Sequence, residues 1–295
     1  MNNSYIKQVG LKNFLWRNFK LKIINSKKNK FSYTLINNIN YDIHKWDPSA
    51  TEVYITQCFS DWGNEYLFLD SLENRKKNIF LDVGCHSGYY TLLFNKYFNK
   101  IIGIEPSKKS FEILKNFKND KVSYYQYFVG DECKKVESVD SESGYSFYDK
   151  RSSYKQTIFQ ELDQITLDKF CKSNKLQDIN AIKIDVDGID LKVLYGAKET
   201  IELNRPSILI ENYSNELFEY FKDLDYSLLS MVATKEKPYN LNLEELKIFD
   251  QNKWIKMVCC VPSEFKKNYI KTFFKGNIIS GVNKKEILRN FNFKY

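Results

Sequence analysis

From residue 79 onward, the chain alternates short apolar runs with longer segments of helical spacing. The runs at 79–83 and 101–104 are apolar except for Asp82, and helical segments follow them at 89–97 and 108–117. A strand followed by a helix, repeated along the chain, is the pattern of a parallel sheet covered by helices. The pattern therefore predicts an α/β fold.

Further apolar runs extend the same sheet. We expect five more strands, at 122–129, 181–185, 207–211, 226–232 and 257–261. Together with the first two, they predict a seven-stranded, mostly parallel sheet with helices on both faces.

The remaining segments flank or interrupt this sheet. Residues 1–60 mix aromatic side chains with Lys and Asn and lack long periodic runs, so we interpret them as an N-terminal extension to a domain at 61–262. Residues 263–295 form a basic, aromatic C-terminal extension. Within the domain we expect a loop at 144–153 and a short helix at 167–172.

The charge and cysteine content bear on the cellular setting. Forty-five Lys and Arg against 37 Asp and Glu leave a net charge of +8, which is diffuse and densest near the two ends, as on an ordinary solvated surface. The six cysteines show no CxxC spacing, and Cys259 and Cys260 fall in an apolar run typical of a buried strand. No run approaches the roughly 18 apolar residues of a membrane span. We expect a cytoplasmic protein with reduced thiols.

A loop with GxxxG spacing, Gly84 to Gly88, lies directly between the first strand and its helix. Glycines here let the backbone turn sharply and approach a ligand at the carboxyl edge of the sheet. Glu105 ends the second strand, where a carboxylate can accept hydrogen bonds from both hydroxyls of a ribose. Asp131, after the third strand, is placed to accept one from an adenine amine, and a solvated turn is its alternative role. These positions predict a site for an adenosyl group.

These residues and two further runs resemble the FkbM family of methyltransferases. The five matching runs, in family order, are 81–91, 104–106, 129–131, 166–168 and 183–197. The resemblance covers about residues 60–262 and implies a class I methyltransferase, Rossmann-like fold with S-adenosyl-L-methionine as the methyl donor. It also implies a set of cofactor-binding residues: Asp82, Gly84, Cys85, His86, Ser87, Gly88, Tyr90, Thr91, Glu105 and Asp131.

Two motifs depart from the family pattern. The family loop usually reads Gly-Ala-Asn-Ile-Gly, whereas this chain places Cys85, His86 and Ser87 between the glycines. The family's Asp-Val-Glu-Gly-Ala-Glu is shortened by one methylene at both Glu positions, which are Asp187 and Asp190 here. These departures do not change the assignment of the cofactor site. They bear on the identity of the acceptor and on the role of the second acid.

Methyl transfer to an alcohol requires the removal of a proton from a weakly acidic hydroxyl. One route uses a divalent metal. Asp185 ends the fourth strand, and Glu211 and Asn212 end the fifth, so three hard oxygen ligands of the kind that suit Mg²⁺ or Mn²⁺ are expected at one edge. This spacing resembles that of cation-dependent O-methyltransferases. In the alternative, Asp185 positions the cofactor or a loop, while the other two cap the next segment.

The second route uses a side-chain base. Asp187 is the better candidate, with the N-cap of the following helix as its alternative role. His86, one of two histidines, lies in the cofactor loop, where satisfying backbone groups is the commoner role. The catalytic candidates are therefore Asp185, Asp187 and His86.

The resemblance favours O-methylation of a sugar, either nucleotide-activated or attached to a glycan, for a cell-surface polysaccharide such as capsule or lipopolysaccharide. The expected partner is this small-molecule sugar, with no nucleic acid, because the motif that holds a flipped base is missing after the fourth strand. Alternatives are a non-sugar acceptor, a nicotinamide-dependent oxidoreductase and a noncatalytic assembly module, and a homodimer stays open.

Overall fold

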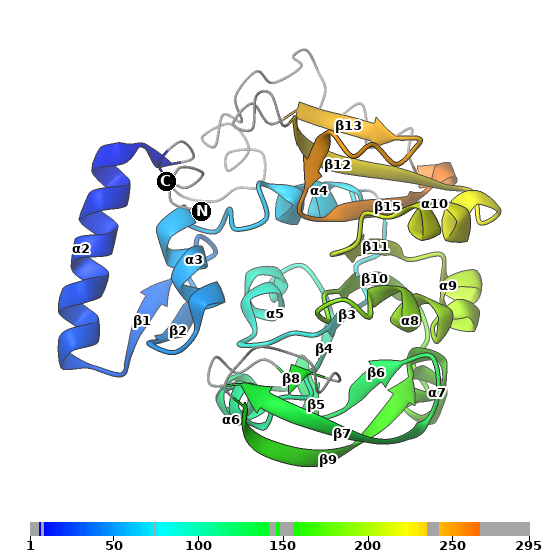
Figure 1. The fold of residues 1–295 in the computed structure, drawn as a ribbon. Helices are drawn as coiled ribbons and strands as arrows, with labels where there is room; N and C mark the ends of the chain where they lie inside the picture. Colours follow the sequence, from blue (N-terminus) through cyan, green and yellow to red (C-terminus); the bar gives the residue numbers. More distant parts are fainter. Residues whose placement is uncertain are drawn as a thin grey trace.

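The computed structural model describes residues 6, 9–73, 75–141, 146–147, 156–234 and 242–265. In this part of the chain a central nine-stranded sheet runs in the order β13-β12-β15-β11-β10-β3-β4-β5, with β14 paired to β12 (Figure 1). Its strands are β3 (Ile79–Val83), β4 (Lys100–Ile104), β5 (Val122–Tyr125), β10 (Ile179–Ile184), β11 (Ser207–Ile210), β12 (Tyr226–Thr234), β13 (Asn242–Leu246), β14 (Lys253–Ile255) and β15 (Val258–Pro262).

The expected mostly parallel sheet is confirmed. The five strands from β5 to β11 are parallel to their neighbours, whereas β15 lies between β11 and β12 and is antiparallel to both. This arrangement is the class I methyltransferase order that the resemblance implied. The predicted count of seven strands was wrong, because β13 and β14 add antiparallel pairs to β12.

The predicted third strand at 122–129 is divided in two. β5 stays in the central sheet, whereas β6 (Phe128–Gly130) turns away after residues 126–127 and pairs in parallel with β9 (Gln156–Thr166). β9 also pairs with β7 (Lys134–Ser141), which pairs with β8 (Ser146–Phe147) to complete a four-stranded second sheet. The loop expected at 144–153 is therefore a strand at β8, and its other residues lie outside the described ones.

Helices cover both faces of the central sheet. They are α4 (Asn64–Asp70), α5 (Tyr89–Phe94), α6 (Lys108–Leu114) with the 3₁₀ turn η1 (Lys115–Phe117), α7 (Leu167–Ser173), α8 (Asp190–Tyr195), α9 (Lys198–Asn204) and α10 (Asn215–Lys222). Ser107 caps α6 as expected, because its hydroxyl accepts a hydrogen bond from the backbone N–H of Ser110. The short helix expected at 167–172 is confirmed as α7.

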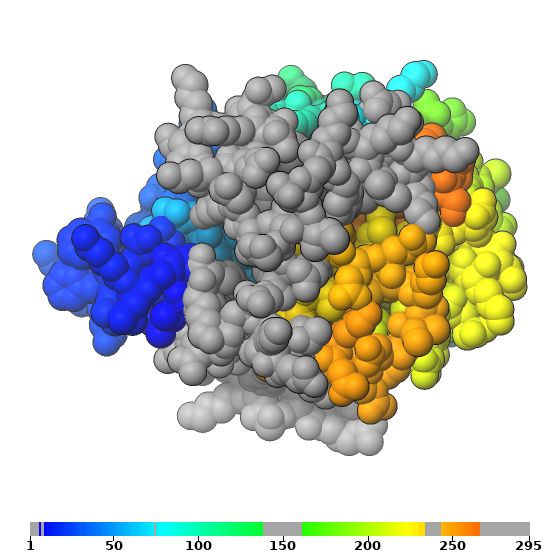
Figure 2. All heavy atoms as spheres, turned by 90° about the horizontal axis from the view of Figure 1, so that it is seen from above, coloured from blue at the N-terminus to red at the C-terminus, as the bar shows by residue number. Residues whose placement is uncertain are grey.

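The residues interpreted as an N-terminal extension are folded. They form α2 (Leu11–Lys27), a hairpin of β1 (Lys30–Thr34) and β2 (Asn40–His44), and α3 (Pro48–Thr56). In Figure 2, seen from above, α2 projects at one side of the molecule. The hairpin and α3 instead share a hydrophobic core with β3 and α5, through Tyr41 and Val53 among others.

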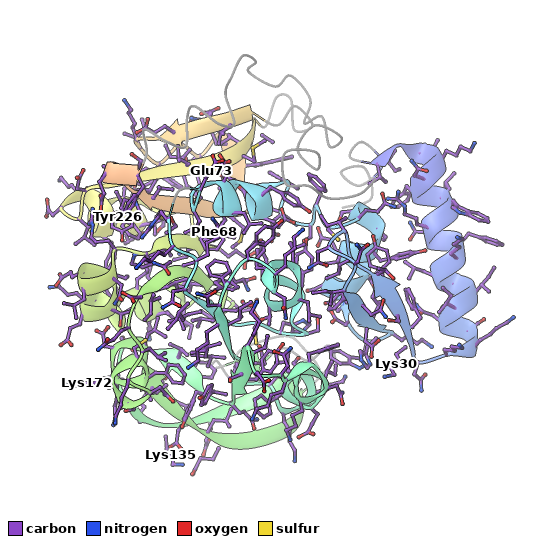
Figure 3. All side chains as sticks on the ribbon, turned by 180° about the vertical axis from the view of Figure 1, so that it is seen from behind. Lys30, Phe68, Glu73, Lys135, Lys172 and Tyr226 are labelled. Carbon is purple, nitrogen blue, oxygen red and sulfur yellow. The ribbon has the colours of Figure 1, made fainter. Side chains whose placement is uncertain are left out.

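Apolar side chains fill the space on both sides of the sheet (Figure 3). On one side, Phe68 of α4 lies 6.0 Å from Phe80 and 5.9 Å from Phe94, measured between ring centroids. On the other, Phe170 and Leu194 belong to a second buried cluster. Cys259 and Cys260 are fully buried in β15, as predicted, and all six cysteines are free thiols. Among the described residues, no helix is long and apolar enough to cross a membrane.

Candidate functional site

The loop after β3 adopts a conformation that requires its two glycines. Gly84 has a φ of 73° and Gly88 a φ of 85°, in the left-handed region that side chains disfavour. A Cβ atom on Gly84 would lie 1.9 Å from the carbonyl oxygen of Asp185, so β3 and β10 can meet there only without a side chain. The glycines therefore bring the loop against the carboxyl end of β10.

Glu105 holds the same loop from the neighbouring strand. Its Oε2 accepts a hydrogen bond from the backbone N–H of His86 (2.8 Å), and its Oε1 accepts one from that of Ser107 (2.9 Å). Burial raises the pKa of Glu105 to about 7, against the opposing effects of His86 and these N–H groups. A carboxylate has about four acceptor positions, so this one retains capacity for further hydroxyl donors.

A pocket of about 550 Å³ opens beside this loop, a volume typical of small-molecule sites. It lies where β3, β4 and β10 end, as ligand sites do in open α/β sheets. Nine of the residues predicted from the sequence line it: Gly84, Cys85, His86, Ser87, Tyr90, Glu105, Asp185, Asp187 and Glu211.

The other predicted residues lie outside this lining. Asp82 and Thr91 are fully buried behind it, where the Thr91 hydroxyl donates to Asp82 Oδ2 (2.7 Å), and Gly88 begins α5. Asp131 is exposed and Asn212 lines a neighbouring hollow. The structure therefore brings together the loop, Glu105 and the acids after β10 and β11, but not Asp131.

Lys183, which the sequence analysis missed, organises the charges beneath the pocket. It is 3% exposed, donates to the carbonyl oxygen of Gly84 (2.9 Å), and its Nζ lies 3.0 Å from Asp185 Oδ2 and 3.8 Å from Asp82 Oδ1. A lysine in an otherwise apolar strand was the signal that could have revealed it. Its ammonium provides the counter-charge for both carboxylates.

Asp185 and Glu211 form a coupled carboxyl pair. Burial opposes ionisation of Asp185, but the Lys183 ammonium and a hydrogen bond with Glu211 hold the pKa of Asp185 below its usual value. Burial and the nearby charge of Asp185 raise the pKa of Glu211. The pair therefore shares a proton, with the charge on Asp185 and the proton on Glu211.

The donor set does not fit the predicted metal site. Asn212 Oδ1 accepts a hydrogen bond from the Ser214 hydroxyl (2.8 Å), and Lys183 already neutralises Asp185. Across the described residues, no three His, Cys, Asp or Glu side chains are grouped to hold a metal ion. The geometry supports a proton-sharing pair at this edge rather than three converging metal ligands.

The two candidate bases differ in setting. Asp187 has an exposed surface and a left-handed φ of 52°; desolvation of its carboxyl by the surrounding protein, followed by the charge of Asp185, raises its pKa. It is not the N-cap of α8, which is Ile189, so the alternative role considered for it was wrong. His86 also has a positive φ, 48°, and its Nδ1 lies 3.7 Å from Oδ2 of the fully buried Asp47.

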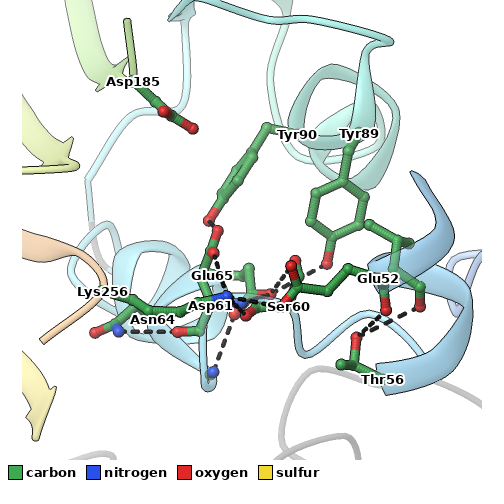
Figure 4. Close-up of polar contacts among 12 residues, drawn as sticks. Glu52, Thr56, Ser60, Asp61, Asn64, Glu65, Tyr89, Tyr90, Asp185 and Lys256 are labelled. Carbon is green, nitrogen blue, oxygen red and sulfur yellow. Dashed lines mark hydrogen bonds and ion pairs between the residues drawn. The ribbon is translucent and has the colours of Figure 1, made fainter. Parts of the chain in front are cut away.

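Residues from before β3, together with Tyr90 and Lys256, form a second wall of the pocket (Figure 4). The Tyr90 hydroxyl donates to Asp61 Oδ2, and Lys256 Nζ lies 2.7 Å from Glu52 Oε1 and 3.8 Å from Asp61 Oδ1. Lys256 also donates to the carbonyl oxygen of Ser60 (2.6 Å). This wall therefore combines acceptors and a cation.

Glu65 supports the wall from behind. Its Oε1 accepts from the backbone N–H of Asp61 (3.0 Å) and from the Tyr89 hydroxyl (3.2 Å), and its Oε2 accepts from the N–H of Gly63 (3.0 Å). Burial and the charge of Asp61 raise the pKa of Glu65 to about 8. Lys256 contacts Glu52 and Ser60 across about two hundred residues, and pairings of that kind leave no local signal in the sequence from which this wall could be predicted.

Comparisons with known proteins agree with this arrangement. A family model described as the methyltransferase FkbM domain matches residues 82–233. A Dictyostelium discoideum protein with a provisional methyltransferase name is 39% identical over 59 residues, which cover 20% of this chain and 22% of that protein.

Two solved structures are similar at low identity. The FkbM methyltransferase from Methylobacillus flagellatus KT is 13% identical with a TM-score of 0.42, and the match covers 84% of this chain and 60% of that one. M. capricolum TrmK, in complex with S-adenosyl-homocysteine, is 11% identical with a TM-score of 0.35, and the match covers 77% and 92%. The chain therefore spans about a fifth of the curated relative and three fifths of the first structure.

Proposed function

Because the chain belongs to the FkbM methyltransferase family, whose model matches just over half of its 295 residues, we propose that it methylates a hydroxyl group of a glycan-attached sugar. The family identifies the chain as a methyltransferase and implies S-adenosylmethionine as its donor. The observation that supports the acceptor class is the pocket, which joins the adenosine-sized loop site to a wall of carboxylates, hydroxyls and one ammonium group.

The residues around the loop fit the donor. Glu105 retains acceptor positions for the two ribose hydroxyls, and Gly84, Cys85 and Ser87 of the loop line the pocket beside it. Pro106, Phe128 and Val129 supply apolar lining beyond Glu105, where an adenine ring would pack. The bound donor supplies an electrophilic methyl group on a positively charged sulfur.

The second wall suits a neutral, hydroxyl-rich acceptor. Six carboxyl groups line the pocket, against two lysines, Lys183 and Lys256. An acidic lining repels a diphosphate, which favours a sugar within a glycan over a nucleotide-activated sugar. Glu52, Asp61 and Lys256 would orient the acceptor by hydrogen bonds to its hydroxyls.

The Asp185–Glu211 pair would remove the proton. When the acceptor oxygen takes the methyl group from the sulfur of a bound donor, its proton would pass to Asp185, which carries the charge of the pair and lines the pocket. Lys183 keeps Asp185 ionised between turnovers, while Asp187 is the other acidic base candidate in the same lining.

The test is transfer of a labelled methyl group to a panel of free monosaccharides, nucleotide-sugars and oligosaccharides, with and without EDTA, followed by mass spectrometry. We expect a gain of one methylene on an oligosaccharide that survives the chelator. Asp185→Asn should lower kcat by about 10²-fold or more with S-adenosyl-homocysteine binding retained. Asp120→Asn, at an exposed acid outside the lining, is the matched control and should leave activity unchanged. Methylation of nucleotide-sugars alone would contradict the proposal that the acceptor is a glycan-attached sugar. Loss of activity with EDTA would contradict proton removal by the Asp185–Glu211 pair without a metal.

A further inference from the structure

A second hollow opens beside the candidate site, with a volume of about 700 Å³. Four aromatic residues line it: Trp62, Tyr213, Phe249 and Trp254. Glu211 and Lys256 line both this hollow and the cofactor pocket, so the two form one continuous surface. We call the second hollow the aromatic groove.

We propose that the aromatic groove binds the sugar units next to the methylated one, so that the acceptor is an oligosaccharide and not a free sugar. This inference rests on the proposed function, because it assigns the groove to the same acceptor. The supporting observation is that Glu211 and Lys256 line both hollows. A sugar chain that leaves the pocket past these two residues therefore enters the groove.

The two indoles provide surfaces for stacking. Trp254 is 44% exposed on the short strand β14, and Trp62 is partly exposed with a left-handed φ of 61°. In the part of the chain that the structure describes, neither ring stacks on another aromatic ring. A pyranose presents an apolar C–H face of similar area, and burying it against an indole is favourable.

Tyr213 and Phe249 make a fixed base for the groove. Their ring centroids are 4.9 Å apart, and the Tyr213 hydroxyl accepts a hydrogen bond from the backbone N–H of Asp250 (2.7 Å). A ring held at both its face and its hydroxyl keeps its position without a ligand, which reduces the entropy lost on binding.

Polar side chains surround these rings. Asn212, Asp250, Gln251 and Lys253 line the groove and offer both donors and acceptors. Aromatic planes with amide and carboxylate groups around them match the chemistry of a sugar, which has apolar ring faces and hydroxyl edges. A purely apolar ligand would cover these polar groups without offering them hydrogen bonds.

Binding to immobilised oligosaccharides and to their component monosaccharides tests the groove. We expect the full-length protein, with S-adenosyl-homocysteine present, to bind oligosaccharides more tightly than their units. Trp254→Ala should weaken oligosaccharide binding by about tenfold, whereas Trp254→Phe should retain most of it. Trp16→Ala is the matched control, since Trp16 is 55% exposed on α2 and outside both hollows, and should change nothing.

Kinetics separate this inference from the proposed function. Trp254→Ala should raise KM for an oligosaccharide acceptor and leave kcat, monosaccharide methylation and S-adenosyl-homocysteine binding unaltered. Equal KM values in the variant and the parent protein would contradict sugar binding in the groove. Oligosaccharides that bind no more tightly than single sugars would contradict it as well. If instead the proposed function is wrong, the protein should bind the donor but transfer no methyl group to any sugar.

Discussion

Lys183 joins two carboxylates and a backbone carbonyl beneath the pocket, so its removal leaves charges buried without a partner. We expect Lys183→Met to lower the free energy of unfolding by about 3–5 kcal/mol, measured by urea titration. The exposed Lys198→Met should change it by less than about 0.5 kcal/mol. Adding Asp82→Asn to Lys183→Met should recover part of the loss, and an equal loss in the double variant would count against this pairing.

Glu105 makes donor binding depend on pH. Its pKa of about 7 lies above the usual carboxyl value, so the group is protonated below neutrality and ionised above it. The ribose hydroxyls donate hydrogen bonds and so favour the ionised form of Glu105. At low pH, binding of the methyl donor therefore releases a proton from this carboxyl group. Calorimetry should show S-adenosyl-homocysteine binding weaker at pH 6 than at pH 8, by up to about tenfold per pH unit below 7. Glu105→Gln should bind more weakly with a flat profile, and a pH dependence that survives in this variant would assign it to another group.

The residues that the sequence predicted are those whose roles are local. Gly84 and Gly88 follow a strand directly, and Glu105 ends the next one, so their positions at the sheet edge follow from chain order alone. Lys183 lies opposite Asp82 on neighbouring strands, although about a hundred residues separate the two in the sequence. Such a pairing has no local pattern, and the sequence analysis passed over it.

At the scale of elements, seven strands of the central sheet were predictable because each is mainly an apolar run, whereas β13 and β14, which carry Glu244, Glu245 and Lys253, were not. β3 matches its prediction at both ends, while the run at 122–129 hid a break at residues 126–127, since both β5 and β6 are apolar. The hairpin and α3 were not predictable. Their buried faces are completed by residues of β3 and α5, which lie far along the chain.

The hairpin also braces the cofactor loop. The Tyr41 hydroxyl of β2 lies 2.5 Å from Ser87 Oγ, and this contact is buried. We expect Tyr41→Phe to weaken S-adenosyl-homocysteine binding severalfold and to lower stability by about 1 kcal/mol, because one buried hydrogen bond is lost. Tyr33→Phe, on the neighbouring strand β1 and outside the pocket lining, serves as the control in the same calorimetric and melting measurements. Equal donor affinity in the parent protein and Tyr41→Phe would show that the loop holds its shape alone.

Across the whole molecule, charge is divided unevenly. The chain carries +8, yet carboxyl groups outnumber lysines six to two around the pocket. Sinefungin, which carries an amine near the position of the sulfonium, should therefore bind several times more tightly than neutral S-adenosyl-homocysteine at low salt. The difference should narrow as salt is added, because exposed charges are screened. Equal affinities at low salt would mean that the acidic lining does not act on the donor.

Most of the wall beside the donor site, at residues 41–61 and Lys256, lies outside the matched stretch at 82–233, although Tyr90 lies within it. Much of the surface that would orient the methylated sugar is thus a separate length of polypeptide from the cofactor loop and Glu105. Evolution could replace one while preserving the other, and so could a protein engineer. Exchanging the leading segment between relatives would then redirect which alcohol is methylated and spare the chemistry of the transfer.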